Sequence, residues 1–257
     1  MSGKRKLSLG TLGVAIAVLA VAAAAAALLF SLRSDDDGNP SSAPAKELSD
    51  EPNVVAADLQ AFWASTFESQ TRTYEPAKFA PLADAGAGGC KQLARNAVSF
   101  YCAADQTLYL DGPFLEEVQA SGGTLAQAYV VAHLFGHHVQ QVLGITEKVL
   151  NQQLDKPARA PLLNRQIELE ADCLGGYGIA GVTGAGAPAS DEFKAPIESV
   201  QAAAEGGVKQ QAGVLNAETW ENGPAADQVE WIDRGLALTD VASCDTFSGA
   251  VPEEAPR

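Results

Sequence analysis

All three histidines of this chain, His133, His137 and His138, lie within six consecutive residues. His133 and His137 are four residues apart, so on a helix their imidazole rings project from one face, one turn apart. Two rings placed in this way can reach a single metal ion. The spacing therefore predicts a metal site, and the alternative is that these histidines only form hydrogen bonds in a packed core.

The residue that follows the first histidine is Leu134. Zinc peptidases with two histidines at this spacing have the pattern His-Glu-x-x-His, in which the glutamate is the general base. Leucine can neither take a proton from a metal-bound water nor pass one to a leaving amine. The sequence thus predicts a metal site without the usual catalytic group. We expect His138, one turn after Leu134, to have a structural role or to support the metal ligands, and the alternative is that it approaches the position of the base.

A zinc site with two histidines from one helix needs a further ligand from another element. Glu168 and Asp172 are four residues apart in a segment, 161–175, that we expect to be helical. We expect Glu168 to bind the metal and Asp172 to accept a hydrogen bond from the free ring N–H of a ligand histidine. Glu170 should face away from the metal. The alternative is that both carboxylates belong to an ordinary solvated helix face.

The hydrophobic pattern indicates a mainly helical domain with a short extended part. The helix that carries the histidines should begin near Thr124, and apolar residues on nearly all of its sides indicate that it is buried. Residues 99–111 look like two extended runs around a turn, and residues 181–189 look like a flexible Gly- and Ala-rich loop. The predicted helices are 53–70, 124–143, 161–175, 191–205 and 225–238.

The composition is acidic, with 32 Asp and Glu against 17 Lys and Arg among 257 residues. Nucleic-acid binding needs a basic surface, so we expect no nucleic-acid partner. Hydrophobic residues make up 47% of the chain, which is enough to bury a sizeable core.

The N-terminus has the pattern of a membrane anchor. Lys4, Arg5 and Lys6 precede an uncharged run over residues 7–32, long enough to cross a bilayer core. Because basic residues stay on the cytoplasmic side, we expect a single-pass protein with a cytoplasmic N-terminus and an extracytoplasmic main domain. A cleaved signal peptide is the alternative, although its apolar region is usually shorter. The predicted organisation is a cytoplasmic stub and transmembrane helix at 1–33, a disordered linker at 34–52, a folded domain at 53–250 and a tail at 251–257.

Four cysteines, Cys90, Cys102, Cys173 and Cys244, lie in the part that we place outside the membrane. An even number in an oxidising compartment suggests two disulfides. Three pairings are possible. Cys90 and Cys102 are close in sequence across a Gly-rich turn, and pairing them leaves Cys173 with Cys244.

Residues 132–140, Ala-His-Leu-Phe-Gly-His-His-Val-Gln, resemble the Ala-His-Glu-x-Gly-His-His-Val-Gln helix of a family of bacterial, membrane-anchored neutral zinc metallopeptidases. The similarity continues in order through Phe100-Tyr101-Cys102, Ala104-Asp105-Gln106, Tyr109-Leu110-Asp111, Glu168-Leu169-Glu170-Ala171-Asp172-Cys173 and Cys244-Asp245-Thr246-Phe247. It covers about residues 90 to 247. The resemblance implies an α+β, mainly helical, zincin-like domain with a small sheet, an edge strand beside the active helix, and a thermolysin-like His, His, Glu site for Zn²⁺.

Two departures from the family pattern bear on activity. Leu134 replaces the general base. Near the C-terminus the family carries His-Gly, then Gln-Arg and a tryptophan, which align with Asn222-Gly223, Gln228-Val229 and Trp231. Asn222 would then stand where the resemblance implies an oxyanion-stabilising histidine, and Val229 where it implies an arginine.

We therefore expect a zinc-binding pseudopeptidase that binds a protein or peptide in its cleft and contacts the membrane through its N-terminal helix. One alternative is an active zinc endopeptidase with a non-standard base such as His138. The other alternative is a metal-free interaction module.

Overall fold

The computed structural model describes residues 45–87, 89–91, 98–211 and 224–248. The expected anchor at 1–33, the tail at 251–257 and Asn222 lie outside the described residues. Within those ranges, no helix is both long enough and apolar enough to cross a membrane.

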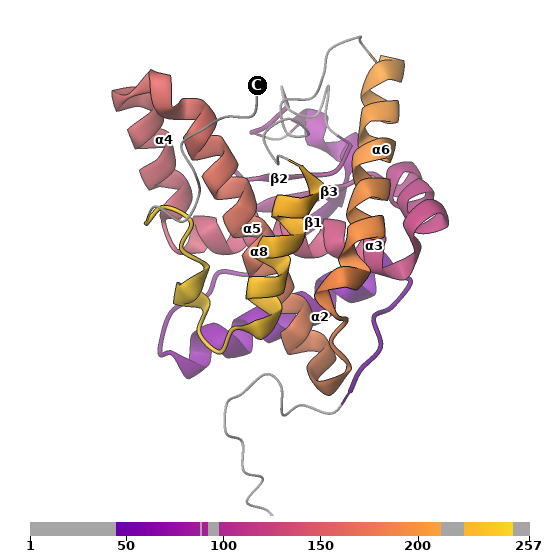
Figure 1. Cartoon of the computed structure of the whole chain (residues 1–257). Coiled ribbons are helices and arrows are strands. Elements are labelled where there is room, and N and C mark those ends of the chain that lie inside the picture. Colours follow the sequence, from indigo (N-terminus) through magenta and orange to yellow (C-terminus); the bar gives the residue numbers. More distant parts are fainter. Residues whose placement is uncertain (1–44, 88, 92–97, 212–223, 249–257) are drawn as a thin grey trace, which may run out of the picture.

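The described fold is mainly helical with one small sheet, in agreement with the sequence prediction (Figure 1). Short 3₁₀ helices connect several of the elements. In chain order the helices and strands are α2 (Pro52–Ser69), β1 (Lys78–Pro81), β2 (Phe100–Cys102), β3 (Thr107–Leu110), α3 (Gly112–Val142), α4 (Ile145–Asp155), α5 (Ala160–Thr183), α6 (Lys194–Gln211) and α8 (Ala225–Ala237).

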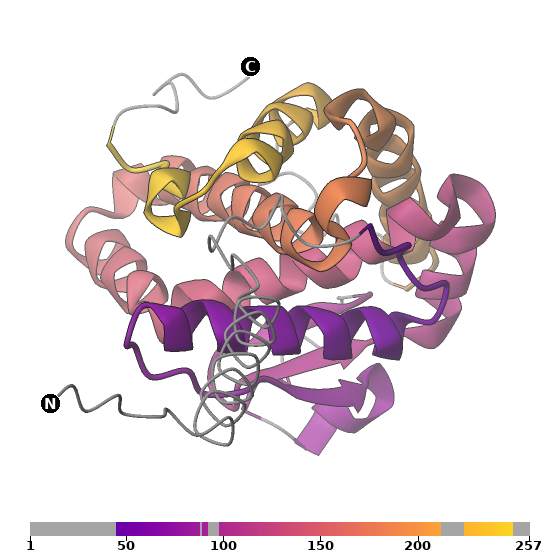
Figure 2. The same cartoon turned by 90° about the horizontal axis from the view of Figure 1, so that it is seen from below.

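The elements form successive layers. The strand order is β1-β3-β2, with β1 parallel and β2 antiparallel to β3. The sheet contacts α3, α3 packs on α5, and α5 packs on α8, while α6 lies along α3. Figure 2 shows the strands and α8 on opposite sides of the molecule. Because α3 and α5 occupy the middle layers, the side chains between them are shielded from solvent.

Helix α3 differs from the prediction at its start. It begins at Gly112 and contains a break at Gly123, whose φ of 76° and ψ of −176° are not helical. The predicted start near Thr124 therefore corresponds to the second half of α3. The first half was not predicted, although one of its faces carries the buried side chains of Phe114, Leu115 and Val118.

Helix α5 is longer than predicted, because the glycines in its C-terminal half do not end it. The prediction ended the helix at Gly175, whereas α5 continues to Thr183. A Cβ at Gly175 would lie 3.1 Å from the Ala132 carbonyl carbon of α3, and one at Gly176 would lie 2.5 Å from a backbone oxygen of α8. These glycines therefore allow close helix packing, and the loop expected at 181–189 begins only after Thr183.

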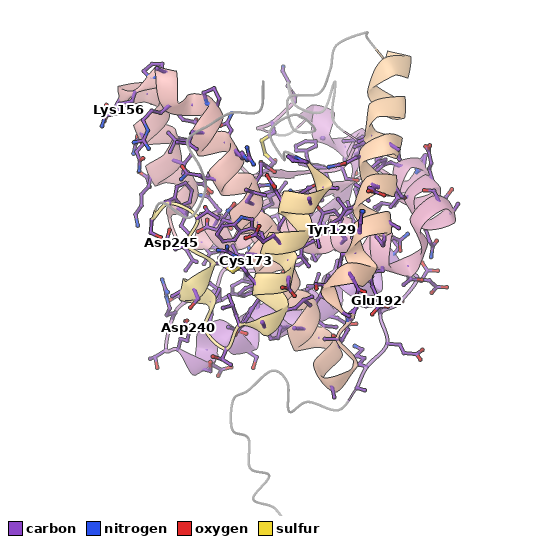
Figure 3. All side chains as sticks on the ribbon, in the orientation of Figure 1. Tyr129, Lys156, Cys173, Glu192, Asp240 and Asp245 are labelled. Carbon is purple, nitrogen blue, oxygen red and sulfur yellow. A yellow bond between two sulfur atoms is a disulfide. The ribbon has the colours of Figure 1, made fainter. Side chains whose placement is uncertain are left out.

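The disulfide pairing favoured by the sequence is confirmed. Cys90 is bonded to Cys102 of β2, and Cys173 of α5 is bonded to Cys244, each with an S–S distance of 2.05 Å. The second bond holds a short 3₁₀ helix, Val241–Cys244, against α5. Figure 3 labels Cys173 in the interior of the molecule.

Candidate metal centre

The candidate site lies where α3 and α5 cross closely. A Cβ at Gly136 of α3 would lie only 2.4 Å from the carbonyl oxygen of Ala171 in α5. Glycine at this position therefore lets the two backbones approach. His133 and His137 on α3 consequently face Glu168 on α5 across a short gap.

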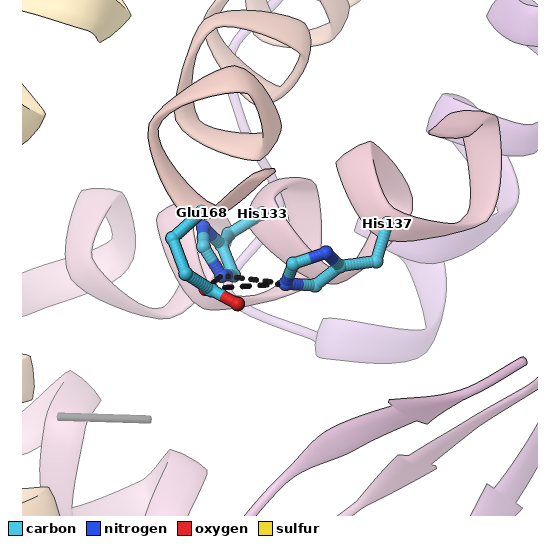
Figure 4. A group of neighbouring side chains, drawn as sticks. All are labelled: His133, His137 and Glu168. Carbon is cyan, nitrogen blue, oxygen red and sulfur yellow. Dashed lines mark hydrogen bonds and ion pairs between the residues drawn. The ribbon is translucent and has the colours of Figure 1, made fainter. Parts of the chain in front are cut away.

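The structure brings together the three side chains predicted to bind metal (Figure 4). The His133 Nε2 and His137 Nε2 atoms are 3.1 Å apart, and Glu168 Oε2 lies 3.2 Å from the first and 3.3 Å from the second. A tetrahedral zinc site with bonds of about 2.0–2.1 Å has ligand–ligand edges of about 3.3 Å. Two histidine nitrogens and one carboxylate oxygen at these separations fit three corners of such a site.

Asp172 contacts the outer nitrogen of the first histidine, the arrangement predicted from its spacing. Asp172 Oδ1 lies 2.8 Å from His133 Nδ1 and accepts a hydrogen bond of 2.9 Å from the Tyr129 hydroxyl. Gln228 of α8 in turn donates to the same hydroxyl at 2.8 Å. Tyr129, labelled in Figure 3, is buried. It precedes His133 by four residues, so helical spacing alone could have predicted that it lies beside His133.

Gln140 contacts the outer nitrogen of the second histidine. Its Oε1 lies 2.9 Å from His137 Nδ1, and its Nε2 donates to Glu170 Oε2 at 2.9 Å. The sequence pattern did not predict a role for Gln140. With Nδ1–H groups directed to Asp172 and Gln140, both rings turn Nε2 toward the same point, as metal ligands require.

Charges in the site are tightly coupled. Burial lowers the pKa of His133, but Asp172 and Glu168 outweigh this effect and raise the pKa to about 10. Burial raises the pKa of Glu168, but His137 and His133 outweigh it and hold that pKa well below its usual range. Without a metal, the site therefore keeps a proton on His133 and a negative charge on Glu168. A divalent cation can take the place of that proton.

His138 lies in different surroundings from the other two histidines. Its Nε2 donates to the Glu75 carbonyl at 2.9 Å, so its Nδ1 accepts from the Tyr101 hydroxyl at 3.1 Å. The side chain is fully buried, and burial lowers its pKa to about 4. Both ring nitrogens are thus engaged away from His133 and His137. These contacts give His138 a structural role beside the segment leading to β1, rather than a place at the metal ligands or at the base position.

Leu134 lies in the wall of the pocket that contains the metal-binding side chains. It is 5% exposed and lines this pocket together with His133, His137 and Glu168. The remaining lining residues are mainly apolar: Val98, Ser99, Phe114, Tyr129, Val130, Val200, Gln201, Ala204 and Gln228. Val229 of α8 is partly buried against the core and does not line the pocket.

Comparison with known proteins gives the same family as the sequence motifs. A family model described as "Putative neutral zinc metallopeptidase" matches residues 6–247. The uncharacterized protein YpfJ of Escherichia coli is 30% identical over 206 residues, covering 77% of this chain and 71% of that protein. The uncharacterized protein Rv2575 of Mycobacterium tuberculosis is 35% identical over 177 residues, covering 63% of this chain and 59% of that protein.

No solved structure matches this chain significantly. The family model alone spans most of the sequence, and it includes the histidine helix, the Glu168–Asp172 segment and all four cysteines. The chain therefore belongs to the neutral zinc metallopeptidase family.

Proposed function

We propose that this protein is a pseudopeptidase: a zincin-like domain that binds one Zn²⁺ through His133, His137 and Glu168 and holds a peptide without hydrolysing it. When bound, zinc supplies a Lewis acid that attracts a carbonyl oxygen and lowers the pKa of a coordinated water. Asp172 and Gln140 fix the proton on the outer nitrogen of each histidine. Each Nε2 lone pair is then available to the metal.

The observation that supports the loss of hydrolysis is the composition of the pocket wall. Among the described lining residues, those that titrate are Tyr129, His133, His137 and Glu168. Three of these are the proposed ligands, and the Tyr129 hydroxyl is held between Asp172 and Gln228. No lining side chain within the described ranges is left to take a proton from water, and Leu134 makes the wall beside the ligands apolar.

The same wall supports the choice of ligand. Its mainly apolar side chains favour an apolar side chain of a bound peptide. We further propose that the domain lies outside the cytoplasm on a single N-terminal membrane helix. The uncharged run at 7–32 supports the anchor, and the two disulfides favour an oxidising compartment.

Metal analysis and a peptidase assay test the proposal. The purified protein should contain about one zinc per chain. His133→Ala should lose it, and Glu147→Ala, which removes an exposed carboxylate of α4, should keep it. The zinc-loaded protein should leave a library of quenched fluorescent peptides uncleaved. Absence of zinc would support the metal-free module instead, and cleavage abolished by a chelator would support an active endopeptidase.

A further inference from the structure

Gln140 lies between a proposed metal ligand and a second buried carboxylate. It is fully buried, and its two amide ends contact different partners. Oε1 lies 2.9 Å from His137 Nδ1, whereas Nε2 donates to the Ile167 carbonyl at 2.7 Å and to Glu170 Oε2 at 2.9 Å. Both acceptors of Nε2 belong to α5, so Gln140 joins α3 to α5 directly behind His137.

These partners determine which way the amide of Gln140 points. The Ile167 carbonyl can only accept a hydrogen bond, so the amide nitrogen must face it and the amide oxygen must face His137. An oxygen in that place accepts a hydrogen bond, which requires His137 Nδ1 to carry the hydrogen. The Nε2 lone pair of His137 then points toward His133 and Glu168. Ile167 and Glu170 therefore set the tautomer of His137 through Gln140.

We propose that Gln140 and Glu170 form a positioning relay that holds His137 ready for zinc, an inference that rests on the zinc site proposed above. Neither residue touches the metal. The relay differs from the support of His133, where the carboxylate of Asp172 contacts the ring directly. A neutral amide at His137 places no further negative charge against the ligands, while Glu170, one contact away, restrains the amide.

The far end of the relay can be changed without overfilling the core. Glu170 is 5% exposed and also lines a second pocket of about 370 Å³, together with Lys148 and Asp245. A side chain of similar length at this position can therefore shift into the pocket. Gln140, by contrast, is enclosed, so its replacement must match its shape.

The first test replaces Gln140 by methionine, which has a similar length but neither accepts nor donates these hydrogen bonds. We expect Gln140→Met to weaken zinc binding by about 10- to 100-fold, measured by competition with a chelating indicator. We also expect altered visible absorption of the Co²⁺-substituted protein, because the second histidine is no longer held in place. Gln141→Met makes the same change on a different face of α3 and should leave both readouts as in the wild type.

A second pair of variants leaves Gln140 in place. Glu170→Met removes the acceptor for Gln140 Nε2 and should weaken zinc binding, whereas Glu170→Gln retains an acceptor oxygen and should restore most of the affinity. The unfolding midpoint of each metal-free variant is measured alongside. A structural role alone would lower this midpoint and leave the Co²⁺ spectrum unchanged, and that result would overturn the relay.

Zinc binding by the wild-type protein separates the relay from the zinc site on which it depends. If the wild-type protein binds no zinc, both are overturned. If the wild type binds zinc and Gln140→Met binds it with the same affinity and the same Co²⁺ spectrum, the relay alone is overturned.

Discussion

Replacing Leu134 by glutamate tests whether the missing base is the main reason for the proposed inactivity. Leu134 lines the pocket beside His133, His137 and Glu168, so a carboxylate there can lie next to a zinc-bound water. General acid–base assistance contributes about 10²- to 10⁴-fold to a rate. We expect Leu134→Glu to cleave peptides that many times faster than the wild type, and cleavage should stop when a chelator removes the zinc.

The structure also predicts the effect of this substitution on stability. Leu134 is 5% exposed, and burying a leucine side chain contributes about 1.5–3 kcal/mol. The metal-free variant should lose at least that much, because the new carboxylate also lies in the same pocket as the charged Glu168. Zinc should restore much of the loss, since the ion attracts both carboxylates. Urea unfolding with and without zinc measures both quantities.

Leu134→Gln is the matched control, because glutamine has the shape of glutamate but cannot act as a base. It should show the same loss of packing and no gain in cleavage. The reasoning is refuted if Leu134→Glu is folded, binds one zinc and cleaves peptides no faster than Leu134→Gln. The defect would then lie elsewhere, and Asn222→His would be the next substitution to combine with it.

Three further predictions follow from packing, charge and chain connectivity. Gly136→Ala should separate α3 from α5, because its Cβ would lie 2.4 Å from Ala171 O, and we expect a stability loss of about 1–3 kcal/mol with weaker zinc binding in titrations. Burial raises the pKa of Glu170 from 4.5 to about 7, so the metal-free wild type should lose stability as pH rises through this range. Glu170→Gln does not titrate, so over the same range its free energy of unfolding in urea should rise relative to that of the wild type by up to about 3 kcal/mol. Replacing Cys173 and Cys244 by alanine removes a cross-link across 71 residues and should cost about 4 kcal/mol in the same assay.

The sequence was sufficient to predict the residues of the metal site whose relation is local. His133 and His137 share a helix face, as do Glu168 and Asp172, because helical spacing alone determines which side chains lie together. The contact between the two helices was inferred from the ligands that zinc requires and from the family resemblance. The hydrophobic pattern, which is also a local signal, predicted that these two helices exist, but it missed the start of α3 at Gly112 and the end of α5 at Thr183.

The parts that were not predicted depend on how the helices cross. The predicted helix ends at Gly175, whereas Gly175 and its neighbour Gly176 lie inside α5 at its contacts with α3 and α8. The link from Gln140 to Glu170 exists only once that crossing is fixed, since the two residues are 30 positions apart. Sequence spacing suggested that Glu170 faces away from the metal, but it could not show that Glu170 acts on the metal ligand His137 through Gln140.

The burial of carboxylates on α5 bears on the choice between a zinc-binding domain and a metal-free module. Glu168, Glu170 and Asp172 are 8%, 5% and 1% exposed. Removing several carboxylates from water is costly, and apolar residues of similar volume would be as stable or more stable in a domain that only needs to pack. Two of these carboxylates contact the histidines directly, and the third contacts the glutamine that holds His137. A divalent cation between the histidines and Glu168 would attract these carboxylates and so offset the cost of removing them from water. The buried acids of α5 therefore favour a bound metal, even though Leu134 removes the base.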